Sequence, residues 1–411
     1  MKYLNNKNGA ALVAVLFTAT IISMIGITFI STSFREYKIS HYEEQSIIAH
    51  YAAEGGLQKA LVTLKRYPDW KSNRYWDTLL GQDVPLGNGA YVLSLTDKGG
   101  NVVEITSKGK IGSAVKILKA DVKITKINKI FENLLTINSD SAVTLSSDIC
   151  VYGDMYSNTD ITICSNTRIN GDATCLGETK LTGNQIIEGN LYSGGDIIIF
   201  GNQQIVGNIL GKSNLCIKGN PNIKGTIKIN GEIDPKGKYD VIYGGVGKRE
   251  PIQFPKLTER LIESYRNAAI QEGNYYEDGI LPNYISGTSF VEGSIALSEN
   301  NNISGSGILF INGSLSITGN TSIKSDKDEI ILIIATGKIK ISGNKNSECI
   351  FFTPNELKVS ENVDLHGSIA AKNVTGNGKL TIRAPENIHN RLPDNSIGDF
   401  ETYIDVISLK Y

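Results

Sequence analysis

The stretch GNLYSGGDIIIFGNQQIV, residues 189–206, consists of three lines of six residues: GNLYSG, GDIIIF and GNQQIV. Each line begins with Gly followed by Asn or Asp, which tolerate positive φ and tight corners. The four residues left between corners are too few for a helix but enough for a short strand. A chain built from such lines turns a corner every six residues.

The six-residue period continues well beyond this stretch. Counting in steps of six from Asp148 to Asn220 meets Asp or Asn at twelve of thirteen positions. Such regularity is typical of an internal repeat. Departures from the apolar pattern recur every eighteen residues in two series, which are Ser157, Cys175, Ser193 and Gly211, and Thr167, Gln185, Gln203 and Pro221. Three lines therefore form one coil, and equivalent positions of successive coils stack.

These spacings predict a mainly β fold, a three-sided parallel β-helix that rises roughly 4.8 Å per coil. We expect it to be right-handed, because Gly lies one place off the usual left-handed hexapeptide pattern. The repeats extend over 136–235. The interior is predicted to stack Ile163, Leu181, Ile199 and Ile217, and one row of corners to form an asparagine ladder from Asn166, Asn184, Asn202 and Asn220.

A second, less regular array occupies 287–383, where GSIALS, GSLSIT and GKIKIS open successive coils. In the interruption over 236–286, LTERLIESYRNAAIQ predicts a helix over 257–271 that ends at Gly273. The open end of a solenoid is an unpaired strand edge. We therefore expect this helix to cover the apolar end of the solenoid. Residues 384–411 are predicted to be a C-terminal tail.

Composition limits the function of the 411-residue chain. Its 41 basic and 42 acidic residues give a net charge of −1 with no basic stripe, which argues against nucleic-acid binding. The four histidines lie far apart in the sequence and suggest no catalytic pair. No cofactor is expected. The cysteines match no metal-ligand spacing and are predicted to be packing residues or unpaired thiols; they are Cys150, Cys164, Cys175, Cys216 and Cys349.

The amino-terminal segment has no charged residue between Lys7 and Arg35. Residues 10–34, 25 in number, would form a helix of roughly 37 Å, long enough to cross a bilayer. The pattern predicts one helix over 10–71 with a transmembrane segment over 10–34. One interpretation is a plain single-pass anchor with a helical stalk. The stalk has large apolar residues at helical spacing, namely Ile47, Tyr51, Leu57, Leu61 and Leu64.

The same residues resemble the class III leader of type IV pilins, and in detail PilX-type minor pilins. The resemblance rests on a short basic leader ending at Gly9, a small residue at Ala10, and the apolar run ALVAVLFTATIISMIGI that follows. AHYAAEGGLQKAL at 49–61 is similar to the alanine-rich stretch of that family. The second array resembles the β-helical C-terminal regions found behind such leaders in Gram-positive bacteria, and the first resembles bactofilin-like β-helices.

The resemblance implies that residues 1–9 are a leader, which a prepilin peptidase removes between Gly9 and Ala10 at the cytoplasmic membrane. The helix would then pack with other pilins in a pilus or pseudopilus, and the bulk of the chain would be extracellular. Pilins carry glutamate at the fifth mature residue, which here is Ala14. The missing carboxylate and the bulky β-helix imply a low-copy subunit at or near the fibre tip.

Residues 72–135 lie between the long helix and the first array. Strands are predicted near 90–96, 101–107 and 112–125, with turns at Asn88-Gly89 and at 98–100. A small antiparallel sheet packed on the helix is expected. The resemblance to pilins implies the same arrangement, because their headpiece is such a sheet.

Three functions compete for this architecture. The first is a structural minor pilin that presents a rigid extension, and the second is a polysaccharide-degrading enzyme, because parallel β-helices also host such enzymes. The enzyme is disfavoured, because outward positions such as Thr162, Lys180 and Ile198 stack no carboxylate pair; no catalytic residue is assigned. The third is a membrane-anchored adhesin that binds carbohydrate or another surface through exposed aromatic side chains, the candidates being Tyr152, Tyr156, Tyr192 and Phe200.

The acidic corners raise the question of a metal site. Asp154 would stack on Asp172, and Asp160 on Glu178 and Asp196, at roughly 4.8 Å, where their charges repel one another. Calcium would relieve that repulsion through oxygen ligands. The alternative, solvated turn carboxylates that accept corner hydrogen bonds, is favoured because the nonapeptide calcium pattern of such solenoids is absent.

Overall fold

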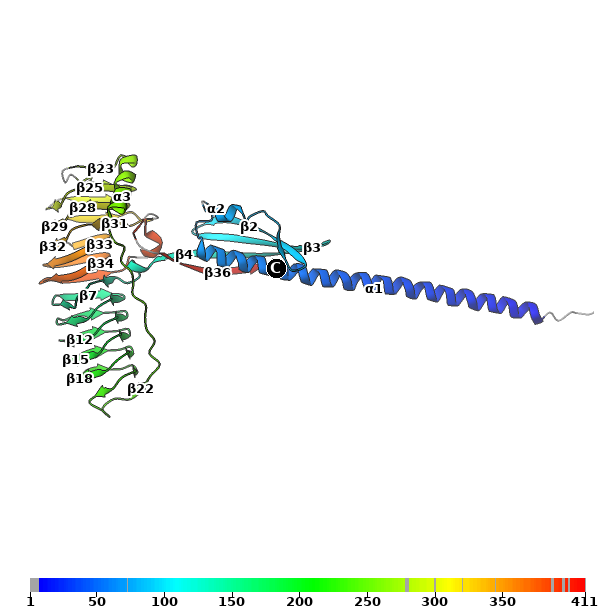
Figure 1. Ribbon diagram of the computed structural model, residues 1–411, viewed down its shortest axis with the longest axis horizontal. Coiled ribbons are helices and arrows are strands. Elements are labelled where there is room, and N and C mark those ends of the chain that lie inside the picture. The colour runs from blue at the N-terminus through cyan, green and yellow to red at the C-terminus, as the bar shows by residue number, and fades with distance from the viewer. Residues whose placement is uncertain are drawn as a thin grey trace, which may run out of the picture. The chain divides into compact units, whose positions relative to one another are not determined.

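The computed structural model divides the chain into two compact units (Figure 1). Unit 1 comprises Met1–Thr125 and Thr402–Tyr411, and unit 2 comprises Lys126–Glu401. Each unit has a hydrophobic core of its own. The residues that the structure describes are 7–71, 73–277, 281–298, 301–319, 321–343, 345–385, 388–393, 396–397 and 400–410.

Unit 1 is built on α1 (Lys7–Arg66), a helix of 60 residues, which confirms the predicted long helix. Its first half exposes apolar side chains from Leu12 to Phe34. Its second half packs on a sheet through small residues and through Leu57 and Leu64 of the predicted stripe, which are 4% and 0% exposed. Ile47 and Tyr51 were expected in the apolar stripe, yet they are 57% and 64% exposed. At this level of the helix the small residues Ala49, Ala52 and Ala53 are buried against the sheet instead.

The sheet of unit 1 has five strands in the order β1-β2-β3-β4-β36. β2, β3 and β4 form the predicted antiparallel meander. The edge strand β36 comes from the stretch predicted to be a tail, so that expectation is corrected. The elements of this unit after α1 are α2 (Arg74–Asp77), β1 (Val84–Leu86), β2 (Gly89–Gly99), β3 (Val102–Ile111), β4 (Ala114–Asn128) and β36 (Phe400–Lys410).

Unit 2 is a three-walled parallel β-solenoid of about 13 coils, as predicted. In the first array each wall repeats every eighteen residues; for example Leu181 pairs with Ile163 on one side and with Ile199 on the other. The first wall contains β5 (Leu135–Ile137), β8 (Met155–Ser157), β11 (Ala173–Cys175), β14 (Leu191–Ser193), β17 (Ile209–Gly211), β20 (Ile227–Ile229) and β22 (Val241–Tyr243).

The other two walls of the first array are equally regular. The second wall contains β6 (Val143–Leu145), β9 (Ile161–Ile163), β12 (Thr179–Thr182), β15 (Ile197–Phe200), β18 (Leu215–Ile217) and β21 (Ile233–Asp234). The third wall contains β7 (Asp148–Tyr152), β10 (Arg168–Ile169), β13 (Ile186–Ile187), β16 (Gln204–Ile205) and β19 (Asn222–Ile223).

The second array continues the same three walls. Its long strands β33 (Lys345–Ser360) and β34 (Asn362–Gly376) each bend through all three. The first wall also contains β23 (Tyr275–Tyr276), β25 (Thr288–Glu292), β28 (Gly307–Asn312) and β31 (Ile331–Ala335). The second adds β26 (Ile295–Leu297), β29 (Leu315–Thr318) and β32 (Ile339–Ser342), and the third adds β24 (Tyr284–Ile285), β27 (Asn302–Gly305), β30 (Ser322–Ser325) and β35 (Lys379–Arg383).

The two arrays are one stack, which the sequence did not predict. The last coil of the second array pairs with the first coil of the first, through β34 with β5 and β35 with β7. The chain therefore enters the solenoid in its middle and coils outward to β22. It then returns along the outside and coils back to the middle (Figure 1). One continuous core lines the interior, where Ile163, Leu181, Ile199 and Ile217 are at most 6% exposed, as predicted.

The return of the chain uses residues 244–257, called here the return segment, followed by α3 (Glu259–Glu272). The helix was predicted within two residues at its start, and it ends at Gly273 with φ 74°. Its location was predicted wrongly. The helix lies beside the outer face of the first wall and not over an open end of the solenoid. Tyr265 of the helix stacks on Phe310 of the wall, with 5.0 Å between the ring centres. The helix packs on this wall because the wall has apolar residues on its outer face, such as Phe290 and Phe352, as well as in the solenoid interior.

Candidate functional site

The first half of α1 is uncovered by the rest of the chain. Its most apolar window has a mean hydropathy of 2.4 and is 0% buried, so the helix is long and apolar enough to cross a membrane. Five hydroxyl groups of this half donate to carbonyl oxygens of the preceding turn, as Thr18 does to Ala14 at 2.8 Å and Thr28 to Met24 at 2.8 Å. Such bonds satisfy polar groups within an apolar surrounding. This half of the helix therefore suits lipid or other apolar helices.

The predicted processing site lies at the beginning of α1. Residues 1–6 of the predicted leader lie outside the described residues, and the helix already includes Gly9 and Ala10. Ala14 lies in the exposed part, and its carbonyl oxygen accepts the Thr18 hydroxyl. At this position α1 thus presents a methyl group and no carboxylate.

The second half of α1 shows why the stretch at 49–61 is rich in small residues. A Cβ on Gly109 of β3 would lie 2.0 Å from the Ala49 carbonyl oxygen and 2.4 Å from the Ala53 nitrogen. A Cβ on Gly56 would lie 2.4 Å from the Ser107 hydroxyl. The helix and the sheet are therefore in backbone contact, which only Gly and Ala permit. This contact packs the second half of α1 directly on the sheet of unit 1.

The acidic corners of the solenoid accept hydrogen bonds from the next coil. Asp154 accepts the Asp172 N–H at 2.7 Å, and Asp160 accepts the Glu178 N–H at 2.7 Å. Asp196 accepts the Asn214 N–H at 3.0 Å, and the Ser213 hydroxyl and this amide lower the pKa of Asp196. These are corner hydrogen bonds of the kind that the alternative favoured over calcium called for. Within the described part of the chain, no three His, Cys, Asp or Glu side chains come together as a metal site.

The expected asparagine ladder is formed at a different row of corners. Asn208 donates through Nδ2 to Asn190 Oδ1 at 3.0 Å, and Asn190 donates likewise to Asp172 at 3.1 Å. In the predicted row, Asn166 donates its N–H to Asp148 at 3.1 Å. No hydrogen bond links the side chains of the other members of that row, which are all exposed and described; they are Asn184, Asn202 and Asn220.

That third corner is instead held from the inside. Gln185 and Gln203, each 1% exposed, point into the solenoid. Gln203 donates through Nε2 to Gln185 Oε1 at 3.0 Å and to the Gly183 carbonyl at 2.9 Å, and Gln185 donates to the Ser165 carbonyl at 2.9 Å. The signal for this internal amide ladder was present in the sequence, because these glutamines recur at eighteen residues in an apolar series.

Two of the four aromatic platforms proposed for ligand binding are buried. Tyr156 and Tyr192 are 4% and 3% exposed beneath the return segment. The Tyr192 hydroxyl donates to the Gly247 carbonyl at 3.0 Å and accepts the Arg249 N–H at 3.2 Å, while the Tyr156 hydroxyl accepts the Ile252 N–H at 2.9 Å. These tyrosines attach the return segment to the first wall. The prediction that they are exposed platforms for a ligand is therefore wrong.

The other two aromatic residues are accessible. Tyr152 is 43% exposed, and Arg383 lies 4.8 Å from its ring centre. That arginine is ion-paired with Asp364. Phe200, at the end of β15, is partly exposed on the second wall. Its ring lies between the ammonium groups of Lys180 and Lys218, 5.5 Å and 5.3 Å from the ring centre.

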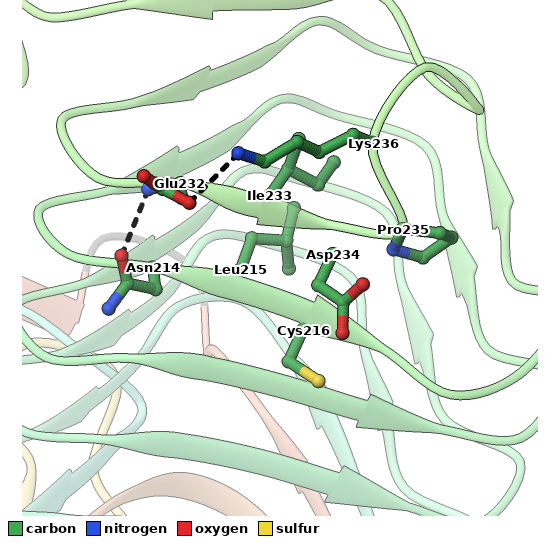
Figure 2. Close-up of a pocket in the computed structure, with 8 residues that line it drawn as sticks. All are labelled: Asn214, Leu215, Cys216, Glu232, Ile233, Asp234, Pro235 and Lys236. Atoms are coloured by element: carbon green, nitrogen blue, oxygen red, sulfur yellow. Dashed lines mark hydrogen bonds and ion pairs between the residues drawn. The ribbon is translucent and has the colours of Figure 1, made fainter.

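An open depression occupies the last coil of the first array (Figure 2). Cys216 and Asp234, which are register partners on β18 and β21, point to the same side of the wall. Lys236 pairs with Glu232 at 3.1 Å, and the Glu232 N–H donates to Asn214 at 2.9 Å. The ammonium group of Lys236 is thus already paired with a carboxylate. All five cysteines are unpaired thiols, as predicted.

Comparison with known proteins gives few matches. No protein-family model and no curated protein matches the chain. Among solved structures, the competence-associated pilin ComZ from Thermus thermophilus is similar at 13% identity and a TM-score of 0.37, covering 89% of this chain and 97% of that chain. An ice binding protein from an Antarctic Flavobacteriaceae bacterium is similar at 13% identity and a TM-score of 0.16, covering 62% and 82%. Similarities at this level transfer no function.

Proposed function

We propose that this chain is a structural subunit of the minor-pilin type, which holds a rigid β-solenoid outside the cell. The observation that carries the proposal is the division of α1. Its first half is apolar and uncovered, and its second half is in backbone contact with its own small sheet. An uncovered apolar half-helix is stable only in lipid or against other apolar helices. The same half would thus anchor the chain in the membrane before assembly and pack with other pilins afterwards.

The finer assignment rests on sequence features. Gly9 followed by Ala10 and an apolar run supports cleavage by a prepilin peptidase, and the small residues at 49–61 support a PilX-type headpiece contact. Ala14 offers no carboxylate to the amino terminus of a neighbouring subunit, and an unpaired charge in an apolar fibre core is costly. Such a subunit is best tolerated at a fibre end, so we propose a low-copy position at or near the tip. The proposal gives the solenoid no catalytic role.

Mass spectrometry of the native protein tests the processing. We expect the mature chain to begin at Ala10, and Gly9→Val to leave the chain uncleaved. Ala10→Ser, which keeps a small residue after the cleavage point, is the matched control and should be processed normally. A native chain that keeps Met1 would support the plain membrane anchor instead.

Immunogold labelling tests the position in the fibre. A low-copy tip subunit predicts label at fibre ends or at scattered points on the cell surface. Dense label along whole fibres would show a major subunit and would overturn the argument from Ala14.

A further inference from the structure

We infer that the second wall of the solenoid carries a binding site for an acidic polysaccharide, centred on Phe200. This site goes beyond the proposed structural role and does not depend on it, because all its residues belong to unit 2. The ligand class is a chain of sugar rings that bear carboxylates, such as a polyuronate.

The first element of the site is an apolar platform. Phe200 and Ile198 lie on β15, and Cys216 is the register partner of Ile198 on β18. All three side chains are partly exposed on the outer face of the wall. A sugar ring has an apolar face of C–H groups that packs on such surfaces, and an aromatic ring is the preferred partner because its face is electron-rich.

The second element is a pair of available cations. Lys180 and Lys218 lie one coil before and one coil after Phe200, and neither forms an ion pair with a described carboxylate. Their contact with the ring is a cation–π attraction, which is weak at exposed sites. A charge-assisted hydrogen bond to a carboxylate is stronger. An acidic sugar can therefore recruit one or both ammonium groups without breaking a salt bridge, and so uncover the ring.

Tyr152, the other accessible residue of the four candidate platforms, lacks this property. Arg383, which lies over the Tyr152 ring, is ion-paired with Asp364. This ion pair would have to break before Arg383 could bind an anion. At the depression of Figure 2, which adjoins the platform at Cys216, Lys236 is likewise paired with Glu232, and Asp234 adds a negative charge. Charge complementarity to an anion therefore favours Phe200.

Charges on the opposite edge of the same wall distinguish a sugar chain from a nucleic acid. Acidic corners follow that edge at Asp160, Glu178, Asp196 and Glu232. A nucleic-acid backbone carries closely spaced phosphates along its whole length and would be repelled by this row. A short acidic oligosaccharide, which bears one carboxylate on each ring, can lie along the edge with the two lysines without crossing to the acidic row.

Titration of the full chain in detergent with oligogalacturonate tests the site. We expect saturable binding that weakens with added salt. Phe200→Leu, which keeps an apolar side chain, and the double variant Lys180→Gln/Lys218→Gln should each weaken binding by about tenfold or more. The double variant Lys224→Gln/Lys248→Gln removes the same charge from exposed lysines elsewhere on unit 2 and should bind as the parent does.

Three results would overturn the proposal. They are no binding of oligogalacturonate by the parent chain, an equal loss in the matched lysine variant, and DNA binding that is as tight and as sensitive to Phe200→Leu. The fibre proposal would stand in each case, because its tests use processing and location. Circular dichroism on every variant shows whether the solenoid is intact.

Discussion

The side-chain amide of Gln203 donates to that of Gln185 at 3.0 Å within the solenoid interior, most of which is apolar. Both side chains are almost fully buried. The residues that follow them, Ile186 and Gln204, are register partners in neighbouring coils, so the two glutamines stack as well. A buried amide costs free energy unless it is hydrogen-bonded. The ladder therefore stabilises the register in which Gln203 stacks on Gln185. A shift of the pairing between neighbouring coils by six residues would leave both amides without this hydrogen bond.

Gln203→Met should destabilise unit 2, because it keeps much of the volume but leaves Gln185 Oε1 without its donor. We expect a loss of about 1–3 kcal/mol in the free energy of unfolding, measured by circular dichroism of the β signal during denaturation. Asn202→Ala, at the exposed neighbouring position, should change the stability by less than about 0.5 kcal/mol. Equal effects of the two substitutions would show that the ladder does not stabilise the coil.

Gly109→Ala should loosen the contact between α1 and its sheet. The added Cβ would collide with backbone atoms of Ala49 and Ala53, which cannot move without shifting the helix. We expect a destabilisation of unit 1 by about 1–3 kcal/mol.

Tryptophan fluorescence measures this effect selectively. The chain has two tryptophans, Trp70 and Trp76, and both belong to unit 1. Their unfolding transition in denaturant should move to lower concentration in Gly109→Ala and stay in place in Lys108→Ala, an exposed neighbour on β3. An unchanged transition in Gly109→Ala would contradict the backbone contact.

Tyr192→Phe should release the return segment. The hydroxyl makes two hydrogen bonds, to Gly247 and Arg249, worth together about 1–2 kcal/mol. Opening of the segment should rise by roughly five- to thirtyfold, and trypsin should cleave faster after Lys248 and Arg249. Tyr243→Phe, at a side chain 62% exposed, is the control and should leave the rate unchanged. A rate that is equal in both variants would mean that this tyrosine does not hold the segment.

The stability of the first array should fall in acid partly through Asp196. The Ser213 hydroxyl and the Asn214 amide lower the pKa of this carboxyl in the folded state. The resulting stabilisation is present above the unfolded value of about 3.9 and is lost as the pH falls through the lower folded value. Asp196→Asn and Ser213→Ala should therefore each lose less stability between pH 6 and pH 2 than the parent, as measured by thermal unfolding. An identical pH dependence in all three would rule out this contribution.

The coil itself was predictable from the sequence because stacking places residues eighteen apart in contact. Small residues recur at one stacked position, as Cys175 and Ser193, and polar residues recur at another, as Gln185 and Gln203. These two series made the eighteen-residue period recognisable in the sequence. The long helix was equally visible from its composition. These features depend on neighbours that are close in the sequence or that repeat.

The order of the coils was not predictable in this way. Ile137 of β5 pairs with Ala371 of β34, far away in the sequence, and LTI at 135–137 looks like any other repeat strand. The burial of Tyr192 depends on the return segment, whose sequence GGVGKREPIQFPKL has no period. The platform at Phe200 was identified, but its two lysines come from different coils and become neighbours only when the coils stack.

The connection between the two units has a consequence for resistance to proteolysis. The chain passes from unit 1 to unit 2 after β4 and returns before β36, and these strands are neighbours in one sheet. Unit 2 is thus inserted into unit 1 with two covalent tethers. A single nick in the solenoid leaves the amino-terminal fragment covalently joined to α1, whereas the carboxyl-terminal fragment stays attached to unit 1 only through the pairing of β36 in the sheet. Release of that fragment after one cut would therefore require β36 to leave the edge of the sheet.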